Sequence, residues 1–263
     1  MAVVCMIKPT LFTLNGEICS MNDDYRDSHT AKGYGKFYDN DLFKEGTFGY
    51  EIWQKEKVIL EDIVTRYTNA GRYLDFACGT GRVLSALEDY FDEAIGLDIS
   101  EDMQNIAKQK IKKATLICGD ATKNDQLVSG KFNCISAFRF FLNAQESLRH
   151  DALKFITNKL ENENAVFIFN IHGNVYSTRW FLVAFDKILG RSKQNQMSLK
   201  QVRKMLEVHN LEIIEYHGVG FIYKVYYKFM PKVLWRFFES VFSSLPFLKN
   251  FSLYFIFVCK KRD

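Results

Sequence analysis

The side chains best placed to do chemistry gather in one stretch, residues 74–82 (LDFACGTGR). Asp75 lies at the end of an apolar run that predicts a buried strand, and a turn of small residues follows before a helical pattern begins. Gly79 and Gly81 let the backbone come close to a ligand, and the new helix offers backbone amides at its positive end. The stretch therefore predicts a ligand bound against the main chain between a strand and a helix.

Two more acids follow the next predicted strands. Asp98 ends the second strand, and Asp120 follows the third in the segment ICGDAT. In a wound α/β sheet, an acid at the tip of the second strand is where the hydroxyls of a ribose can be bound. The glycine spacing does not fit the G-x-G-x-x-G turn of enzymes that bind NAD, so that kind of nucleotide site is the less favoured alternative.

The turn resembles that of the class I, Rossmann-like S-adenosylmethionine (SAM)-dependent methyltransferases, and the resemblance covers residues 48–170. It implies that the turn holds the amino-acid end of SAM, that Asp98 binds the ribose and that Asp120 meets the adenine. Ala77 stands where the family has its first glycine, a mild change that keeps the turn small. The cofactor residues implied by the resemblance are Asp75, Ala77, Cys78, Gly79, Gly81, Arg82, Asp98, Ile99, Met103, Asp120, Ala121 and Phe138, with Tyr38 from an aromatic stretch that closes over SAM in related enzymes.

Three residues after the fourth and fifth strands are candidates for the reacting side, namely His172, Arg139 and Asn143. His172 is expected at the carboxyl edge of the sheet, where its neutral imidazole could accept a proton from a hydroxyl. A hydrogen bond to a loop is the alternative for this histidine. Arg139 could hold the carboxylate of SAM, or a carboxylate or phosphate of the substrate, or it could pair with Asp75 or Glu146. Asn143 is either a substrate contact or a helix cap.

Strands alternate with helices along the chain, which predicts a parallel sheet wound on both faces. With the resemblance, the expected fold is α/β, a seven-stranded, mostly parallel, doubly wound sheet whose last strand is antiparallel, with an N-terminal helical cap. We expect a flexible leader and N-terminal lid over 1–47 and the methyltransferase domain over 48–263, with insertions 171–197 and 221–250 as substrate cover. The predicted strands are 72–76, 93–98, 114–118, 132–138, 165–170, 211–220 and 253–260, and the helices 82–90, 100–110, 145–160 and 198–209, after a first helix that ends at residue 67.

The composition is that of an ordinary globular chain, with 263 residues, 48% of them hydrophobic and 25% charged. These values exclude wholesale disorder, collagen and a small disulfide scaffold. Residues 223–263 carry eight lysines and arginines against Glu239 and Asp263, so the rest of the chain is mildly acidic. A mildly acidic body is not typical of a nucleic-acid-binding protein, which needs a broad basic face.

Aromatic residues are abundant at 15% of the chain, and 14 of the 40 lie within 221–257. Within that segment, apolar residues recur at helical spacing after Pro231, at positions 234, 237, 238, 241, 242 and 245, and Lys232 and Arg236 flank them. The pattern predicts a helix with Pro231 in its first turn that is ended by Pro246, within the segment 231–250. The helix could pack on the core, cover an apolar substrate, or lie on an anionic membrane as a peripheral contact.

The six cysteines are widely spaced and include no CxxC pair, which predicts free thiols, no metal site and a cytoplasmic location. We expect neither a signal peptide nor a spanning segment, because the longest apolar run has seven residues. The sequence predicts a SAM-dependent methyltransferase that acts on oxygen or carbon of a small, bulky or apolar molecule. The alternatives are an N-methyltransferase of an amine or amino sugar, and a non-catalytic SAM-binding partner protein. The sequence predicts no oligomeric state.

Overall fold

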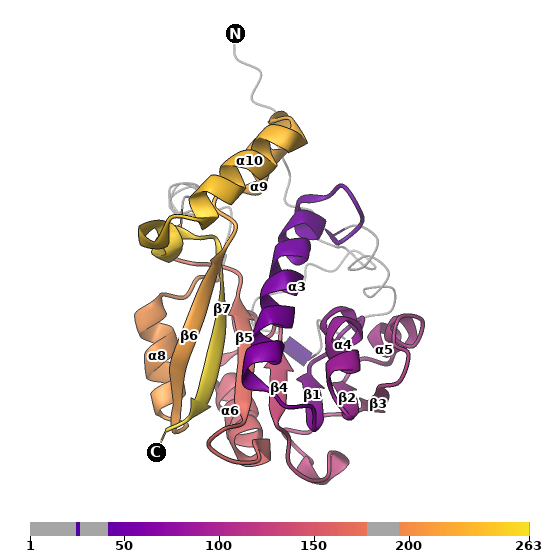
Figure 1. Ribbon diagram of the computed structural model, residues 1–263. Helices are drawn as coiled ribbons and strands as arrows, with labels where there is room; N and C mark the ends of the chain where they lie inside the picture. The colour runs from indigo at the N-terminus through magenta and orange to yellow at the C-terminus, as the bar shows by residue number, and fades with distance from the viewer. Residues whose placement is uncertain (1–24, 27–41, 178–194, 263) are drawn as a thin grey trace, which may run out of the picture.

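The computed structural model describes residues 25–26, 42–177 and 195–262 (Figure 1). Tyr38, most of the predicted leader over 1–47 and residues 178–194 of the first insertion lie outside the described residues. Within the described residues, no helix combines the length and the apolar character that crossing a bilayer requires.

Seven strands form one sheet in the order β3-β2-β1-β4-β5-β7-β6. β1 to β5 pair in parallel, whereas β7 runs antiparallel to both β5 and β6. The predicted mostly parallel sheet with an antiparallel last strand is therefore confirmed. The strands are β1 (Arg72–Phe76), β2 (Glu93–Asp98), β3 (Thr115–Cys118), β4 (Cys134–Ala137), β5 (Val166–Ile171), β6 (Leu211–Val219) and β7 (Tyr254–Lys261).

Helices cover both faces of this sheet (Figure 1). Successive residues of β5 show the two-sided burial, because Phe167 and Phe169 pack with α6 and α8, whereas Val166 and Ile168 pack with α3 and α4. The helices are α3 (Phe48–Tyr67), α4 (Arg82–Leu87), α5 (Glu101–Ala107), α6 (Glu146–Lys159), α8 (Leu199–Glu207), α9 (Lys224–Phe229) and α10 (Lys232–Ser243), with 3-10 turns η2 (Glu88–Tyr90), η3 (Asp125–Leu127) and η4 (Pro246–Phe251).

The predicted elements are all present, with ends that differ by a few residues. Ser100 caps α5 and Ser198 caps α8, each by accepting a backbone N–H of the first turn. The helix predicted over 100–110 ends earlier, because its last turn tightens into i→i−3 hydrogen bonds after Ala107. Pro231 is the cap of α10 and not its first helical residue, and α9 was not predicted.

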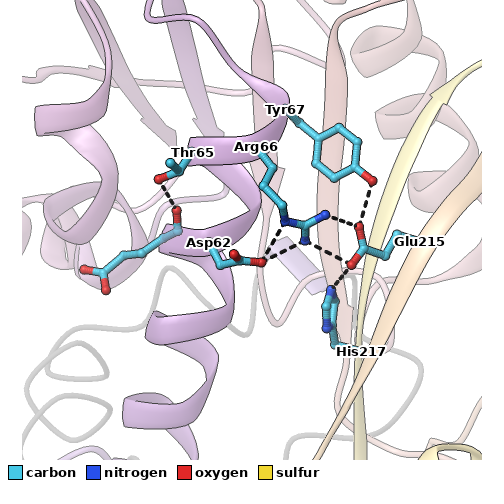
Figure 2. Close-up of polar contacts among 7 residues, drawn as sticks. Asp62, Thr65, Arg66, Tyr67, Glu215 and His217 are labelled. Atoms are coloured by element: carbon cyan, nitrogen blue, oxygen red, sulfur yellow. Dashed lines mark hydrogen bonds and ion pairs between the residues drawn. The ribbon is translucent and has the colours of Figure 1, made fainter. Parts of the chain in front are cut away.

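An ion-pair network fastens the C-terminal end of α3 to the edge strand β6 (Figure 2). The Arg66 guanidinium donates to both carboxylate oxygens of Glu215, at 2.8 and 3.0 Å, and also contacts Asp62. The Tyr67 hydroxyl donates to Glu215 at 2.8 Å, and Nε2 of His217 lies 2.7 Å from the same carboxylate. The hydrogen bonds from Arg66, then from Tyr67, lower the pKa of Glu215 to about 2 against the opposing effect of burial.

This network predicts a pH-dependent contribution to stability. Because the pKa of Glu215 in the folded chain lies below its ordinary value, the contribution is present above pH 4.5 and is lost as the pH falls toward about 2. We expect Glu215→Gln to lower the free energy of unfolding by about 1 kcal/mol at neutral pH, a value kept small because the pair is partly solvated. Urea unfolding at neutral and acid pH measures the difference.

The matched control is Glu212→Gln, because Glu212 is an exposed carboxylate on the same strand. We expect this control to change the free energy of unfolding by less than about 0.5 kcal/mol. If Glu215→Gln lowered the free energy of unfolding equally at acid and neutral pH, the ionised carboxylate would not be the source of the stabilisation.

Candidate active site

A cavity of about 310 Å³ lies at the carboxyl ends of the parallel strands. Its walls come from the loops after β1, β2, β3, β4 and β5, and from residues 25–26 and 42–43 that precede α3. This is the edge at which open α/β sheets bind ligands. The predicted site residues that line it are Asp75, Ala77, Cys78, Gly79, Arg82, Asp98, Ile99, Met103, Asp120, Ala121, Phe138, Arg139, Asn143 and His172.

The turn after β1 is built from left-handed residues. Ala77 has a φ of 56°, a strained value for an alanine, at the position where the resembled family has glycine. Gly81 has a φ of 72° and caps α4, and a Cβ there would lie 2.9 Å from the Cβ of Ala107 in α5. Gly81 therefore allows close packing of the turn on α5, and it is not among the residues that line the cavity.

Asp98 connects this turn to the start of α5. One carboxylate oxygen accepts the backbone N–H of Gly79 at 2.7 Å, and the other accepts that of Ser100 at 2.9 Å. Burial raises the pKa of Asp98, and these two amides act in the opposite direction. Each oxygen keeps a lone pair for a further donor, so the side chain can still accept hydroxyl groups from a ligand.

Asp75 lies deeper, at the end of β1. Its Oδ1 accepts a hydrogen bond from Ser136 at 2.5 Å, and the Ser136 hydroxyl lies 2.7 Å from that of Tyr73. Its Oδ2 is buried without a hydrogen-bond partner among the described residues. Burial raises the pKa of Asp75 to about 7, and the Ser136 hydrogen bond opposes that shift. The cavity therefore contains a carboxyl group that a cationic or N–H-bearing ligand would stabilise.

Asp120, after β3, is held by a residue that the sequence analysis did not single out. Nε of Arg26 lies 2.7 Å from Oδ2 of Asp120, and the backbone of Thr122 donates to Oδ1 at 3.0 Å. Burial acts to raise the pKa of Asp120, but the hydrogen bonds from Thr122 and Arg26 outweigh it, so the pKa is lowered. Tyr25 packs edge-on against Phe140, with ring centroids 5.5 Å apart. Two residues of the predicted leader thus lie against the cavity.

Glu56 of α3 lies between two arginines of the opposite wall, and it was not predicted from the sequence. This carboxylate is fully buried, 3.5 Å from Nη1 of Arg82 and 3.8 Å from Nη2 of Arg139. The Arg82 guanidinium also stacks on Trp53, 4.3 Å from the ring centroid. The predicted alternatives for the partner of Arg139, Asp75 and Glu146, are wrong in this structure, because the loop after β4 turns toward α3.

Asn170 fixes the geometry of that loop. Its Oδ1 accepts the backbone N–H of Arg139 at 2.7 Å, and its Nδ2 donates to Glu56 at 2.9 Å. Arg139 is held with a φ of 61°, a left-handed value that is uncommon for arginine. Asn143 donates to the carbonyl of Arg139 at 2.9 Å and does not cap α6, whose cap residue is Gln145. The helix-cap alternative for Asn143 is therefore wrong.

His172 and Cys78 are two further predicted residues on the cavity wall. His172 is half-buried on the cavity wall, with its ring centroid 6.5 Å from that of Tyr254. Cys78 is buried, and burial raises the pKa of its thiol well above the ordinary value. A neutral, buried thiol is consistent with a space-filling role in the turn.

Comparison with known proteins identifies the fold. Residues 74–163 match the family model of a methyltransferase domain. The structure has the fold of class I SAM-dependent methyltransferases, and residues 74–163 are similar to a methyltransferase domain. The magnesium protoporphyrin IX methyltransferase of Synechocystis, solved with S-adenosylhomocysteine (SAH), is similar with a TM-score of 0.62 and 16% identity over 91% of this chain and 100% of that one.

Two curated relatives add sequence similarity to this likeness in fold. An uncharacterized protein of Methanocaldococcus jannaschii is 25% identical over 88% of this chain and 87% of its own length. An N,N-dimethyltransferase of a dTDP-amino sugar from Streptomyces venezuelae is 34% identical, over 36% of this chain and 39% of its own length. The first match covers the methyltransferase domain together with its flanking elements.

The residues present fit SAM. The buried Oδ2 of Asp75, which lacks a partner among the described residues, suits the ammonium group of an amino acid. Asp98 still offers acceptor capacity for ribose hydroxyls. The individual contacts assigned to the sequence-predicted cofactor residues remain predictions, and that of Tyr38 lies outside the described residues.

Proposed function

We propose that this methyltransferase acts on oxygen or carbon of a small molecule with a bulky, apolar body. The observation that carries the proposal is the composition of the cavity beyond the glycine turn. About half of the residues in the cavity wall are aromatic or aliphatic, and the charged and polar side chains described above make up most of the rest. Its apolar members include Leu42, Phe43, Phe138, Phe140 and Leu148.

The polar groups on this wall suit an acceptor that must lose a proton. SAM supplies an electrophilic methyl group on a sulfonium. His172, when neutral, can accept a proton from a hydroxyl or an acidic C–H of the acceptor. Arg139, held by Asn170 and Glu56, presents a guanidinium for the carboxylate of the cofactor, or for a carboxylate or phosphate of the acceptor.

The names of the similar proteins support a small-molecule acceptor. One is named for a porphyrin and one for an amino sugar. The second name keeps N-methylation of an amine as the alternative activity. The four cysteines of the described part, Cys78, Cys118, Cys134 and Cys259, are free thiols, which supports the proposed cytoplasmic location.

The proposal is tested in two steps with the full chain. Calorimetry with SAH comes first, and we expect a defined, saturable binding isotherm. The protein is then incubated with SAM and three acceptor classes, hydroxy-aromatic compounds, carbon acids and aromatic amines, and SAH formation is followed by mass spectrometry. We expect turnover with the first or second class. Turnover with amines alone establishes the N-methyltransferase alternative, and SAH binding without any turnover supports a non-catalytic role.

The second predicted insertion, residues 221–250, lies wholly within the described part of the chain. Residues 221–250 contribute no lining residue to the cavity within the described part of the chain. Their part as substrate cover, together with that of 171–197, stays a prediction. The structure places this second insertion at the same end of the molecule as the N-terminus of α3 (Figure 1).

A further inference from the structure

The second insertion is fixed to the domain through one face of α10. Trp235 is fully buried there, with its ring centroid 5.1 Å from that of Tyr227 and 6.0 Å from that of Phe48 in α3. Glu239, one turn later, is also fully buried, and it accepts the backbone N–H groups of Phe221 and Ile222 at 2.8 and 2.6 Å. These contacts hold the helix in one orientation and leave its other side facing outward.

The outward side is apolar. Val233 is 79% exposed and Phe237 60% exposed, and Leu234 and Val241 extend the same side of α10. Phe229 and Phe247 continue the exposed apolar surface on either side of the helix. Eight of the fourteen exposed large apolar side chains in the described part of the chain lie within 226–251. Such a concentration marks an interaction surface, because scattered single residues are what an ordinary surface shows.

Positive charge surrounds this surface. Residues 221–251 contain five lysines and arginines, of which Arg236 pairs with Glu51 of α3, and the single carboxylate among them, Glu239, is buried. Lys224, Lys228 and Lys232 are exposed on α9 and at the start of α10. Apolar rings next to flexible cations are the combination that binds a bilayer interface, with rings among the acyl chains and ammonium groups at the lipid phosphates.

We propose that the surface formed by α9, α10 and η4 binds peripherally to a membrane that contains anionic lipids. A second copy of the chain fits less well, because a two-fold contact through this surface would bring like charges of both copies together. The surface also lies close to two residues of the cavity wall. The hydroxyl of Tyr227 donates to the carbonyl of Gly46, and the cavity-lining Leu42 and Phe43 lie just before it. The membrane proposal does not depend on the nature of the methyl acceptor.

Vesicle flotation with the full chain tests this proposal. We use vesicles of phosphatidylcholine alone and of phosphatidylcholine mixed with phosphatidylglycerol. We expect the native protein to float with the anionic vesicles at low salt and to remain in solution with the neutral ones. The double variant Val233→Gln with Phe237→Gln, and the double variant Lys228→Gln with Lys232→Gln, are each expected to lose roughly tenfold or more of the bound fraction.

The matched control is Val208→Gln, because Val208 is 68% exposed but lies after α8, outside this surface. It should float like the native protein. Native protein that stays in solution with both kinds of vesicle overturns the proposal, as does a dimer in light scattering that the Phe237 variant dissociates. SAH calorimetry on the same samples shows that every variant is folded. Native protein that binds SAH but does not float overturns the membrane surface and leaves the methyltransferase function standing.

Discussion

Asp98→Ala is expected to weaken SAH binding by roughly a hundredfold, since hydrogen bonds to a charged group contribute about 1.5–3 kcal/mol each. The substitution removes the acceptor that we assign to the ribose hydroxyls. It also removes the acceptor for the backbone amides of Gly79 and Ser100, at 2.7 and 2.9 Å, so the glycine turn loses its connection to α5. Calorimetry gives the change in Kd, and thermal unfolding shows whether the variant is folded.

A control variant and a modified ligand separate the direct contact from the structural effect. Glu101→Ala replaces an exposed carboxylate in the first turn of α5 and should leave the Kd within about threefold of native. We compare SAH with an analogue that lacks the ribose 2′-hydroxyl. The native protein should bind the analogue less tightly than SAH, whereas the Asp98→Ala variant should bind the two ligands equally. Equal losses for both proteins would show that Asp98 supports the turn and does not contact the ribose.

The sequence predicted those parts of the site that a short run of consecutive residues encodes. The strand, small-residue turn and helix of 74–82 are encoded in consecutive residues, and an acid at the end of a strand reaches the sheet edge whatever surrounds it. Asp75, Asp98 and Asp120 were located in this way, and all three line the cavity. The hydrogen bonds from the backbone of Ser100 to Asp98, and from the backbone of Thr122 to Asp120, follow from the same local geometry.

No pattern in the neighbouring residues marked Glu56 or Arg26 as part of the site. Glu56 lies on a helix among other acidic and basic residues, and only the packing of α3 on the sheet brings it between Arg82 and Arg139. Arg26 is remote in sequence from Asp120, and no periodic pattern connects the two. Ion pairs between distant segments depend on tertiary structure, so one sequence without relatives does not reveal them.

The helix predicted between Pro231 and Pro246 shows a different limit of prediction from sequence. Periodicity predicted the helix, but apolar residues occupy two of its sides, so the pattern could not identify which side packs inward. The buried side holds Trp235 and Glu239, and the predicted stripe through Leu234, Phe237 and Val241 is exposed. A carboxylate is favoured inside because the backbone amides of the preceding segment need an acceptor.

His172→Gln is expected to lower kcat on the order of a hundredfold with the best acceptor, because a positioned general base contributes roughly that factor or more. Glutamine preserves polarity and approximate size but accepts no proton in the working pH range. The SAH Kd should change by less than about threefold. The native rate should fall as acid protonates the imidazole, and the slower variant should lose this dependence on pH.

The matched control is His150→Gln, because His150 lies on α6, outside the cavity lining and beside His209, with ring centroids 4.5 Å apart. It should retain the native rate and the native pH profile. A His172 variant with unchanged kcat at every pH would leave the histidine as a loop contact, and the proton of the acceptor would then pass directly to solvent. A rise in KM without a change in kcat would instead identify His172 as a contact that binds the acceptor equally in the ground state and the transition state.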